Sequence, residues 1–338
     1  MTYHFKNLVF EGGGVLGCAY VGVIEGLSDK GILPLISRVG GNSAGSIVAL
    51  LISLNYSPKE IIKELTELDL KKFADDDWGL IRDTTRFFNK YGWHKGQEMM
   101  KWLEEKIKYK TGSKDTTFGQ MQLLKKEKNF KDLYVTGTNV NRRFSRTFSH
   151  EKDDAMRIAD AIRISMSIPL FFEAVEYEEE TYVDGGVLLN YPIKMFDRQR
   201  FLENKENGVE IGFYEKFQLE SISDPFIYNK ETLGFRIDSE IQRDIISGVM
   251  PPESHHINNI YDFSKNLIGS ILDFQQNVSL MDLDYDRTVF IININKVSAI
   301  NFKISQEEKD ILIKSGKEST LKYFQNFENP EIVMLNRP

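Results

Sequence analysis

A serine flanked by glycines is the first group in this sequence that could carry out chemistry. Gly41-Asn42-Ser43-Ala44-Gly45 fits the G-x-S-x-G pattern of a nucleophile elbow, in which a sharp turn between a strand and a helix lifts the serine out of a sheet. The outer glycines permit the strained backbone of such a turn, and the N-terminus of the helix directs N–H groups at a developing negative charge. Ser43 is therefore predicted to be an acyl-transfer nucleophile.

Three successive glycines precede this serine in the sequence: Gly12, Gly13 and Gly14. Together with Gly17 they match the G-x-G-x-x-G fingerprint of dinucleotide-binding proteins. That fingerprint needs an acidic residue about 20 residues later to hold a ribose, whereas the second predicted strand here ends in the glycines of the elbow. The glycine run instead favours a bare loop whose N–H groups bind an oxyanion beside Ser43.

A carboxylate at the end of a short predicted strand is the third candidate. Asp184 follows Tyr182-Val183 and precedes Gly185 and Gly186, so this backbone could approach another loop closely. A carboxylate in that position could accept a proton from a serine. Since Asp-Gly is also a common turn signal, the residues alone leave both interpretations open.

Apolar periodicity predicts the elements that must position these groups. Short buried strands are predicted at residues 8–10, 35–39, 131–139, 182–183 and 289–294. Helices are predicted at residues 15–29, from 45 onward, and at 58–70, 96–110, 155–165 and 305–325. Because strands and helices alternate near the N-terminus, we expect an α/β fold, a three-layer α/β/α arrangement with a central, mostly parallel sheet.

The chain shows no internal repeat, low-complexity tract or linker, so residues 1–338 are predicted to form a single domain. Its core is expected to comprise residues 5–56, 131–194 and 286–325, with helical excursions at about 57–130 and 195–285.

Two patterns near the end of the second excursion invite functional interpretations. An apolar stripe with helical spacing could form a lid or contact a membrane, but we expect it to pack on the domain: Phe263, Leu267, Ile268, Ile271 and Leu272. Three alternating acids lack the glycine and the closing glutamate of a calcium loop, so we expect them to be solvated: Asp282, Asp284 and Asp286.

The composition limits the partners and the compartment. The 338 residues carry a formal net charge of −7, which argues against nucleic acid as the main partner because phosphate binding needs clustered Lys and Arg. Cys18, the single cysteine, cannot form an internal disulfide. The N-terminus lacks the apolar stretch of a signal peptide, and no apolar run is long enough to cross a bilayer. We therefore expect a soluble protein, either cytoplasmic or exported by a signal-independent route.

In combination, the motifs resemble those of the patatin-like phospholipase family. Residues 11–17 resemble the oxyanion loop of this family, residues 41–46 its elbow and residues 184–186 its aspartate motif. Residues 165–172 and 190–193 resemble the stretches that flank this aspartate. The order and spacing of these segments make the resemblance specific.

The resemblance implies hydrolysis of lipid acyl esters by a phospholipase A or lysophospholipase, without histidine, metal or cofactor. Ser43 would attack the ester carbonyl, and Asp184 would take its proton as general base. The oxyanion would be held by the amides of Gly12, Gly13 and Gly14. The surrounding glycines would support these motifs: Gly17, Gly41, Gly45, Gly185 and Gly186. The implied partners are a phospholipid or other acyl-ester lipid, a membrane surface contacted peripherally and, as for some family members, a protein activator.

One position departs from the family pattern. The oxyanion loop usually carries Arg or Lys where this sequence has Leu16. The backbone amides that would bind the oxyanion do not depend on this side chain. A cation that could orient a phosphate head group is nevertheless missing from this position.

Two other functions stay open at this point. An α/β-hydrolase with a Ser–Asp–His triad would have the right chain order if His255 or His256 were its histidine, although both follow a Pro-Pro pair in a polar loop. Alternatively, the protein could be a non-catalytic or activator-dependent lipid-binding relative. The presence of the serine, the aspartate and the loop glycines favours the enzyme.

Overall fold

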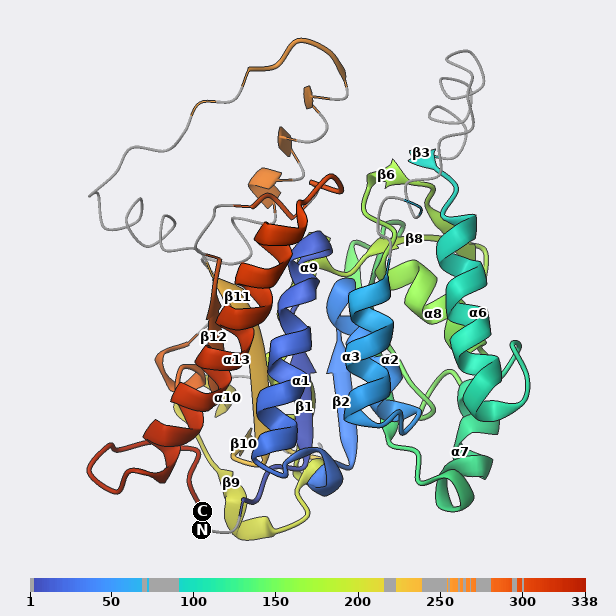
Figure 1. The fold of residues 1–338 in the computed structure, drawn as a ribbon. Coiled ribbons are helices and arrows are strands. Elements are labelled where there is room, and N and C mark those ends of the chain that lie inside the picture. Colours follow the sequence, from blue (N-terminus) through green and yellow to red (C-terminus); the bar gives the residue numbers. More distant parts are fainter. Residues whose placement is uncertain are drawn as a thin grey trace.

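A mixed sheet of eight strands forms the centre of the fold in this computed structural model (Figure 1). Five neighbouring strands run parallel: β12 (Thr288–Ile292), β11 (Thr232–Asp238), β1 (Asn7–Phe10), β2 (Arg38–Gly41) and β4 (Asp132–Asn139). Three further strands pair antiparallel with β4 or with one another: β5 (Phe144–Phe148), β7 (Val175–Tyr177) and β8 (Glu180–Asp184).

The structure describes most of the chain, namely residues 3–68, 72, 91–215, 223–238, 254, 256–260, 262–263, 266–267, 269–271, 281–293, 297–299 and 301–338. Two small sheets lie outside the central one: β3 (Gly92–His94) with β6 (Leu170–Phe172), and β9 (Gly208–Val209) with β10 (Tyr228–Asn229). In these ranges, no helix combines the length and the apolar character needed to cross a bilayer.

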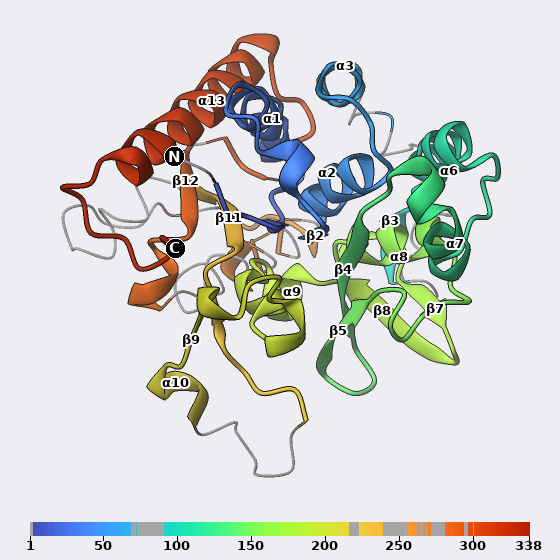
Figure 2. The same ribbon diagram turned by 90° about the horizontal axis from the view of Figure 1, so that it is seen from below.

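Helices cover both faces of the sheet, as Figure 2 shows. One face carries α1 (Tyr20–Asp29), α2 (Ala44–Ser53), α3 (Pro58–Glu67) and α13 (Gln306–Glu328). The short helices α9 (Gly186–Leu189) and α10 (Gly212–Glu215) lie on the opposite face. Toward the β7 end of the sheet lie α6 (Gln97–Thr111), α7 (Phe118–Lys128) and α8 (Ile158–Ser165). The predicted three-layer α/β/α fold is confirmed.

Short 3-10 helices in the described part of the chain join these elements: η1 (Gly14–Ala19), η2 (Leu33–Leu35), η3 (Ile193–Phe196), η4 (Gln199–Phe201), η5 (Lys205–Asn207) and η6 (Asp282–Asp284). Two of them displace predicted elements. The helix expected from residue 15 begins as η1 and becomes α-helical only at Tyr20. The strand expected at 35–39 starts three residues later, because Pro34 helps to form η2 and delays the extended backbone.

The largest departure from the sequence analysis is β11. It lies within residues 195–285, for which helices were expected, yet it pairs with β1 and β12 in the middle of the parallel sheet. All seven of its residues are buried, including Arg236 and Asp238. A central strand that carries charged residues lacks the continuous apolar run that would identify it in the sequence.

The apolar stripe of the same region also differs from expectation. Phe263 and Leu267 were expected to pack on the domain, but their side chains are 48% and 46% exposed. Ile271 is half-buried, and Ile268 and Leu272 lie outside the described residues.

Close contact between α1 and α13 depends on glycines. A Cβ atom added to Gly22 would lie 1.9 Å from the carbonyl oxygen of Ile313, and one added to Gly316 would lie 2.1 Å from that of Ala19. Any larger residue would separate the two helices. The glycines therefore let the first turns of α13 lie against η1 and the start of α1.

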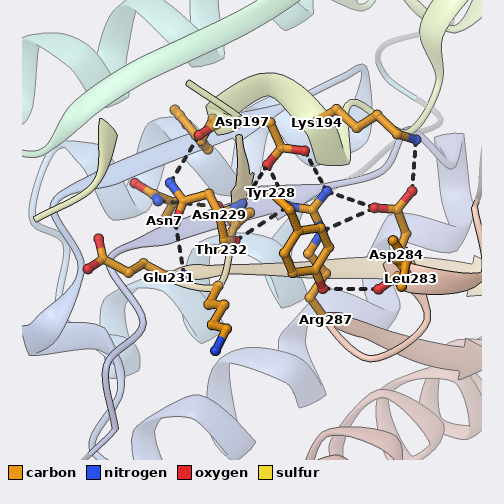
Figure 3. A network of polar contacts seen from close by, with 12 residues as sticks. Asn7, Lys194, Asp197, Tyr228, Asn229, Glu231, Thr232, Leu283, Asp284 and Arg287 are labelled. Atoms are coloured by element: carbon orange, nitrogen blue, oxygen red, sulfur yellow. Dashed lines mark hydrogen bonds and ion pairs between the residues drawn. The ribbon is translucent and has the colours of Figure 1, made fainter. Parts of the chain in front are cut away.

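A buried ionic network joins the start of β12 to η3 (Figure 3). Both side chains that accept from Arg287 are buried with it: Asp197 Oδ1 lies 2.6 Å from its Nη1, and Asp284 Oδ1 lies 2.7 Å from its Nη2. Lys194 Nζ lies 2.7 Å from Asp284 Oδ2. Burial alone would raise the pKa of Asp284, but Arg287 and Lys194 lower it below its usual value. The expectation that Asp284 is solvated was therefore wrong.

Replacing Arg287 by methionine is expected to destabilise the protein by about 3–5 kcal/mol, because two buried carboxylates lose their shared cation. Urea unfolding followed by circular dichroism would measure this loss. The matched control is Arg142→Met, which removes an arginine that is 73% exposed and pairs with Glu180, and which should change the stability little. A loss at Arg287 no larger than at Arg142 would contradict the role of this network.

Candidate active site

Ser43 lies in a strained turn between the end of β2 and the start of α2. Its backbone has φ 48° and ψ −125°, in a region of positive φ that residues other than glycine rarely adopt. Gly41 and Gly45 leave room for this turn. A Cβ added to Gly41 would lie 2.4 Å from the carbonyl oxygen of Gly45, and a Cβ added to Gly45 would lie 2.5 Å from the carbonyl oxygen of Glu11. Strain of about 1–3 kcal/mol is typical of functional sites, where the fold holds a side chain in one orientation.

Asp184, at the end of β8, is the carboxylate that meets Ser43. The Ser43 side chain interacts with this carboxylate and favours its ionised form. Asp184 Oδ1 also accepts from the Gly186 amide at 2.7 Å and from Asn42 Nδ2 at 3.0 Å. Burial raises the pKa of Asp184 from 3.8 to about 6, although the hydrogen bonds from Gly186 and Asn42 and the interaction with Ser43 partly oppose this rise. The structure thus brings the two predicted residues together.

Asn42 links the serine, the aspartate and the glycine loop, and the sequence analysis assigned it no role. Its Nδ2 group donates to Asp184 and, at 3.1 Å, to Asn190 Oδ1. Its Oδ1 atom accepts from Thr136 Oγ1 at 3.0 Å and from Ser165 Oγ at 3.2 Å. All four side-chain partners are buried. No local pattern identifies such a residue, because its partners come from four separate segments.

The amide of Ser43 is also held in place. It donates to Ser165 Oγ at 2.9 Å, and Ser165 lies at the end of α8. Gly185 makes room for Asn42, since a Cβ there would lie 2.4 Å from Asn42 Oδ1. These contacts fix the position of the turn relative to β8.

The glycine loop lies directly beside Ser43. A Cβ added to Gly12 would lie 3.1 Å from the Cβ of Ser43 and 2.4 Å from Asn190 Oδ1. The Gly12 amide, however, already donates to the Asn190 carbonyl oxygen at 3.1 Å, so this amide is not free for an oxyanion. Within the described part of the chain, the amides of Gly13 and Gly14 have no recorded acceptor.

Three further contacts shape this loop. Gly14 has φ 53°, and a Cβ there would lie 2.1 Å from the carbonyl oxygen of Ala299, which accepts from the Val15 amide at 2.8 Å. Gly17 allows η1 to approach α2, since its Cβ would lie 2.7 Å from that of Ala44. Gly17, one of the glycines predicted to support the motifs, therefore lies at a point of close approach between η1 and α2.

Glu11 anchors the base of the loop. Its Oε2 accepts from the Ile237 amide at 2.8 Å and its Oε1 from Asn190 Nδ2 at 3.3 Å. Complete burial raises its pKa to about 8, against the opposing effect of Arg236. Glu11 and Asn190 thus connect the loop to β11, a contact that the sequence analysis did not predict.

An apolar pocket opens at Ser43. Its walls come from η1, α1, α2, the end of α3, residues 166–172 and the first turns of α13, and include Val21, Ile47, Val48, Leu65, Met166 and Phe172. The lining also includes Gly14 of the glycine loop. Leu16, which stands where the family carries a cation, is buried in the main hydrophobic core and is not part of this lining.

Of the two histidines of the alternative triad, His256 alone belongs to the described residues. His256 is exposed, and no described histidine is among the hydrogen-bonding partners of Ser43 or Asp184. His255 lies outside the described residues. The environment of Asp184 in the described structure is made instead by Ser43, Asn42 and Gly186.

Comparisons with known proteins extend the likeness over more than half of the chain. A family model described as patatin-like phospholipase matches residues 8–197, more than half of the chain. Protein R571 of Acanthamoeba polyphaga mimivirus is 34% identical over 193 residues, which cover 57% of this chain and 61% of that protein. The probable lipid hydrolase 463L of Invertebrate iridescent virus 6 is 30% identical over 205 residues, covering 61% of this chain and 68% of that protein.

A solved structure has the same fold. VipD from Legionella pneumophila aligns over 95% of this chain and 67% of its own, with a TM-score of 0.57 and 17% sequence identity. At that identity the likeness concerns the fold alone. Because the matched family model spans both the elbow serine and the buried aspartate, this chain belongs to the patatin-like phospholipase family.

Proposed function

We propose that this protein hydrolyses acyl esters of lipids through a covalent intermediate on Ser43, as a phospholipase A or lysophospholipase. The observation that carries this proposal is the position of Ser43, which interacts with the buried carboxylate of Asp184 and lines an apolar pocket. An apolar pocket beside a nucleophile suits the acyl chain of a lipid. A relative named as a probable lipid hydrolase supports the same reaction class.

In the first half of the reaction, Ser43 Oγ attacks the ester carbonyl carbon while its proton passes to Asp184. The carbonyl oxygen becomes an oxyanion, and the amides of Gly13 and Gly14, for which no acceptor is recorded in the described part of the chain, are the proposed donors to it. The ester C–O bond then breaks, and the leaving alcohol takes the proton from Asp184. The acyl group remains on Ser43.

In the second half, water attacks the acyl group and gives a proton to Asp184. The bond to Ser43 Oγ breaks, the serine recovers its proton, and a fatty acid leaves. A pKa of about 6 suits Asp184 to this task, because the carboxylate is mostly ionised at neutral pH and is a stronger base than an exposed aspartate. The proposed reaction uses no metal or cofactor. Peripheral contact with a membrane and activation by a partner protein stay predictions from the sequence.

Covalent labelling with a fluorophosphonate probe tests the nucleophile directly. Ser43 Oγ is expected to displace fluoride from the phosphorus, so that mass spectrometry of the proteolysed protein finds the label on the peptide that contains Ser43. Asp184→Asn should slow labelling, since the proton acceptor is lost. If the native protein stays unlabelled, or is labelled only on another peptide, the non-catalytic lipid-binding function is the better one.

A further inference from the structure

Lys309 is the only charged side chain among the described residues that line the pocket at Ser43. It lies in the first turns of α13, four residues after Ser305, which caps this helix. The side chain is half-buried. Close packing between α13 and α1 fixes the position of this part of the helix relative to η1.

No counterion for Lys309 is found among the described residues. Within the described residues, its ammonium group makes no recorded ion pair or side-chain hydrogen bond. The adjacent acids have other partners: Glu308 Oε2 accepts from the Ser305 amide at 2.7 Å, and Asp310 Oδ1 accepts from Gln306 Nε2 at 2.8 Å. Cys18 also lines the pocket, but burial raises the pKa of its thiol to about 12, so it is neutral at pH 7.

Helix stability does not explain this lysine either. A cation near the N-terminus of a helix is opposed by the macrodipole, which favours acids there. The first turn of α13 follows this rule with Glu307 and Glu308. An unpaired, half-buried cation beside an apolar pocket carries a desolvation cost that an anionic ligand would offset.

We propose that Lys309 binds an anionic group of the lipid substrate, a phosphate or a carboxylate, and so makes the enzyme prefer anionic acyl esters to neutral ones. This inference rests on the proposed hydrolase function, and it names the substrate class of the same site. The acyl chain occupies the apolar wall, and the anion lies at Lys309. The stem of the lysine packs along the wall while its ammonium group meets the anion.

Two substrates that differ by one phosphate test this preference. 1-Oleoyl-lysophosphatidic acid and 1-oleoylglycerol share the acyl chain and the ester, and both can be presented in micelles of the same neutral detergent. The ratio of their kcat/KM values is measured for the native protein, Lys309→Gln, Lys309→Arg and Lys314→Gln. Lys314 is on the same helix, is 74% exposed and is not part of the pocket lining.

The ratio of anionic to neutral kcat/KM is expected to fall roughly tenfold in Lys309→Gln, the size of a charge-assisted hydrogen bond at a partly exposed site. Lys309→Arg should keep most of the preference, and Lys314→Gln should keep all of it. Equal losses on both substrates would mean a structural role for Lys309. An unchanged ratio in Lys309→Gln would overturn the proposal.

A binding measurement separates this proposal from the proposed reaction. Fluorescently labelled forms of the two lipids are titrated against Ser43→Ala and against Ser43→Ala combined with Lys309→Gln. The first variant should bind the phosphate-bearing lipid more tightly, and the double variant should lose that preference. If Ser43→Ala prefers the phosphate-bearing lipid but the native protein hydrolyses neither lipid, the hydrolase function alone is contradicted. If Ser43→Ala binds both lipids equally well, the role of Lys309 is contradicted.

Discussion

Replacing Ser43 by alanine is expected to stop the release of fatty acid from lipids, with a loss in kcat of at least about 10⁴-fold, because the variant lacks the hydroxyl that we propose forms the acyl-enzyme. Ser43 is 5% exposed and interacts with Asp184, so removing its hydroxyl removes the proposed attacking atom without opening the site. Mass spectrometry of mixed membranes after incubation with each protein would measure free fatty acid and lysolipid. It would identify the reaction class and the head-group preference together.

Ser53→Ala is the matched control for this experiment. Ser53 is a buried serine at the other end of α2, where its hydroxyl donates to the Leu50 carbonyl oxygen at 2.8 Å. This variant should keep the native lipid profile. Equal profiles for the native protein and Ser43→Ala would exclude hydrolysis at this site under the conditions used.

Asp184→Asn is expected to lower kcat by about 10³-fold, the usual loss when a general base is removed. An amide can still accept the hydrogen bonds from Gly186 and Asn42, but it cannot take the proton of Ser43. Hydrolysis of a short-chain ester would measure the loss. A variant that keeps more than about a tenth of the native rate would show that another group is the base.

The pH dependence gives a second check on Asp184. Its pKa of about 6 means that the native rate should rise as the pH increases through 6 and level off above it, because only the ionised carboxylate can accept the proton. The residual rate of Asp184→Asn should lack this rise. A native profile that is flat between pH 5 and 7 would contradict the assignment.

The same pKa predicts that Asp184→Asn is more stable than the native protein. Burial raises the folded pKa above 3.8, so ionisation of Asp184 disfavours the folded state. The cost is absent below pH 3.8, grows as the pH rises to about 6 and is constant above that, where it corresponds to roughly 3 kcal/mol at most. Thermal unfolding at pH 8 should therefore give a higher Tm for Asp184→Asn, whereas Asp154→Asn, at an exposed position, should change it little.

Local patterns in the sequence predicted the elbow because its requirements are local. A serine in a strained turn needs small neighbours in the same segment, and Gly41 and Gly45 meet this need within five residues. The strands that end at Phe10 and Asp184 and the helix that starts just after Ser43 were likewise expected from short-range patterns. Helix and strand propensities act over a few residues, so these elements could be predicted without knowing their neighbours.

Long-range pairing explains what sequence patterns missed. Strand β11 carries the charged residues Arg236 and Asp238 although all of it is buried, and both act electrostatically on the buried Glu11, which lies far from them in the sequence. The buried Arg287 network is another case, since its partners Asp197 and Asp284 are brought together by tertiary contacts rather than by a local motif.

For the site, the sequence by itself determined which residue could be the nucleophile and which backbone could bend around it. Tertiary structure alone decided that Asp184 is buried against Ser43, that Asn42 joins them, and that the Gly12 amide is already bonded to Asn190. It also placed Lys309 in the lining of the same pocket, more than 250 residues after Ser43 in the chain. The physical reason is that contacts between distant segments determine both features. They bury Asp184 and so raise its pKa, and they enclose the pocket, and neither effect exists until the chain has folded.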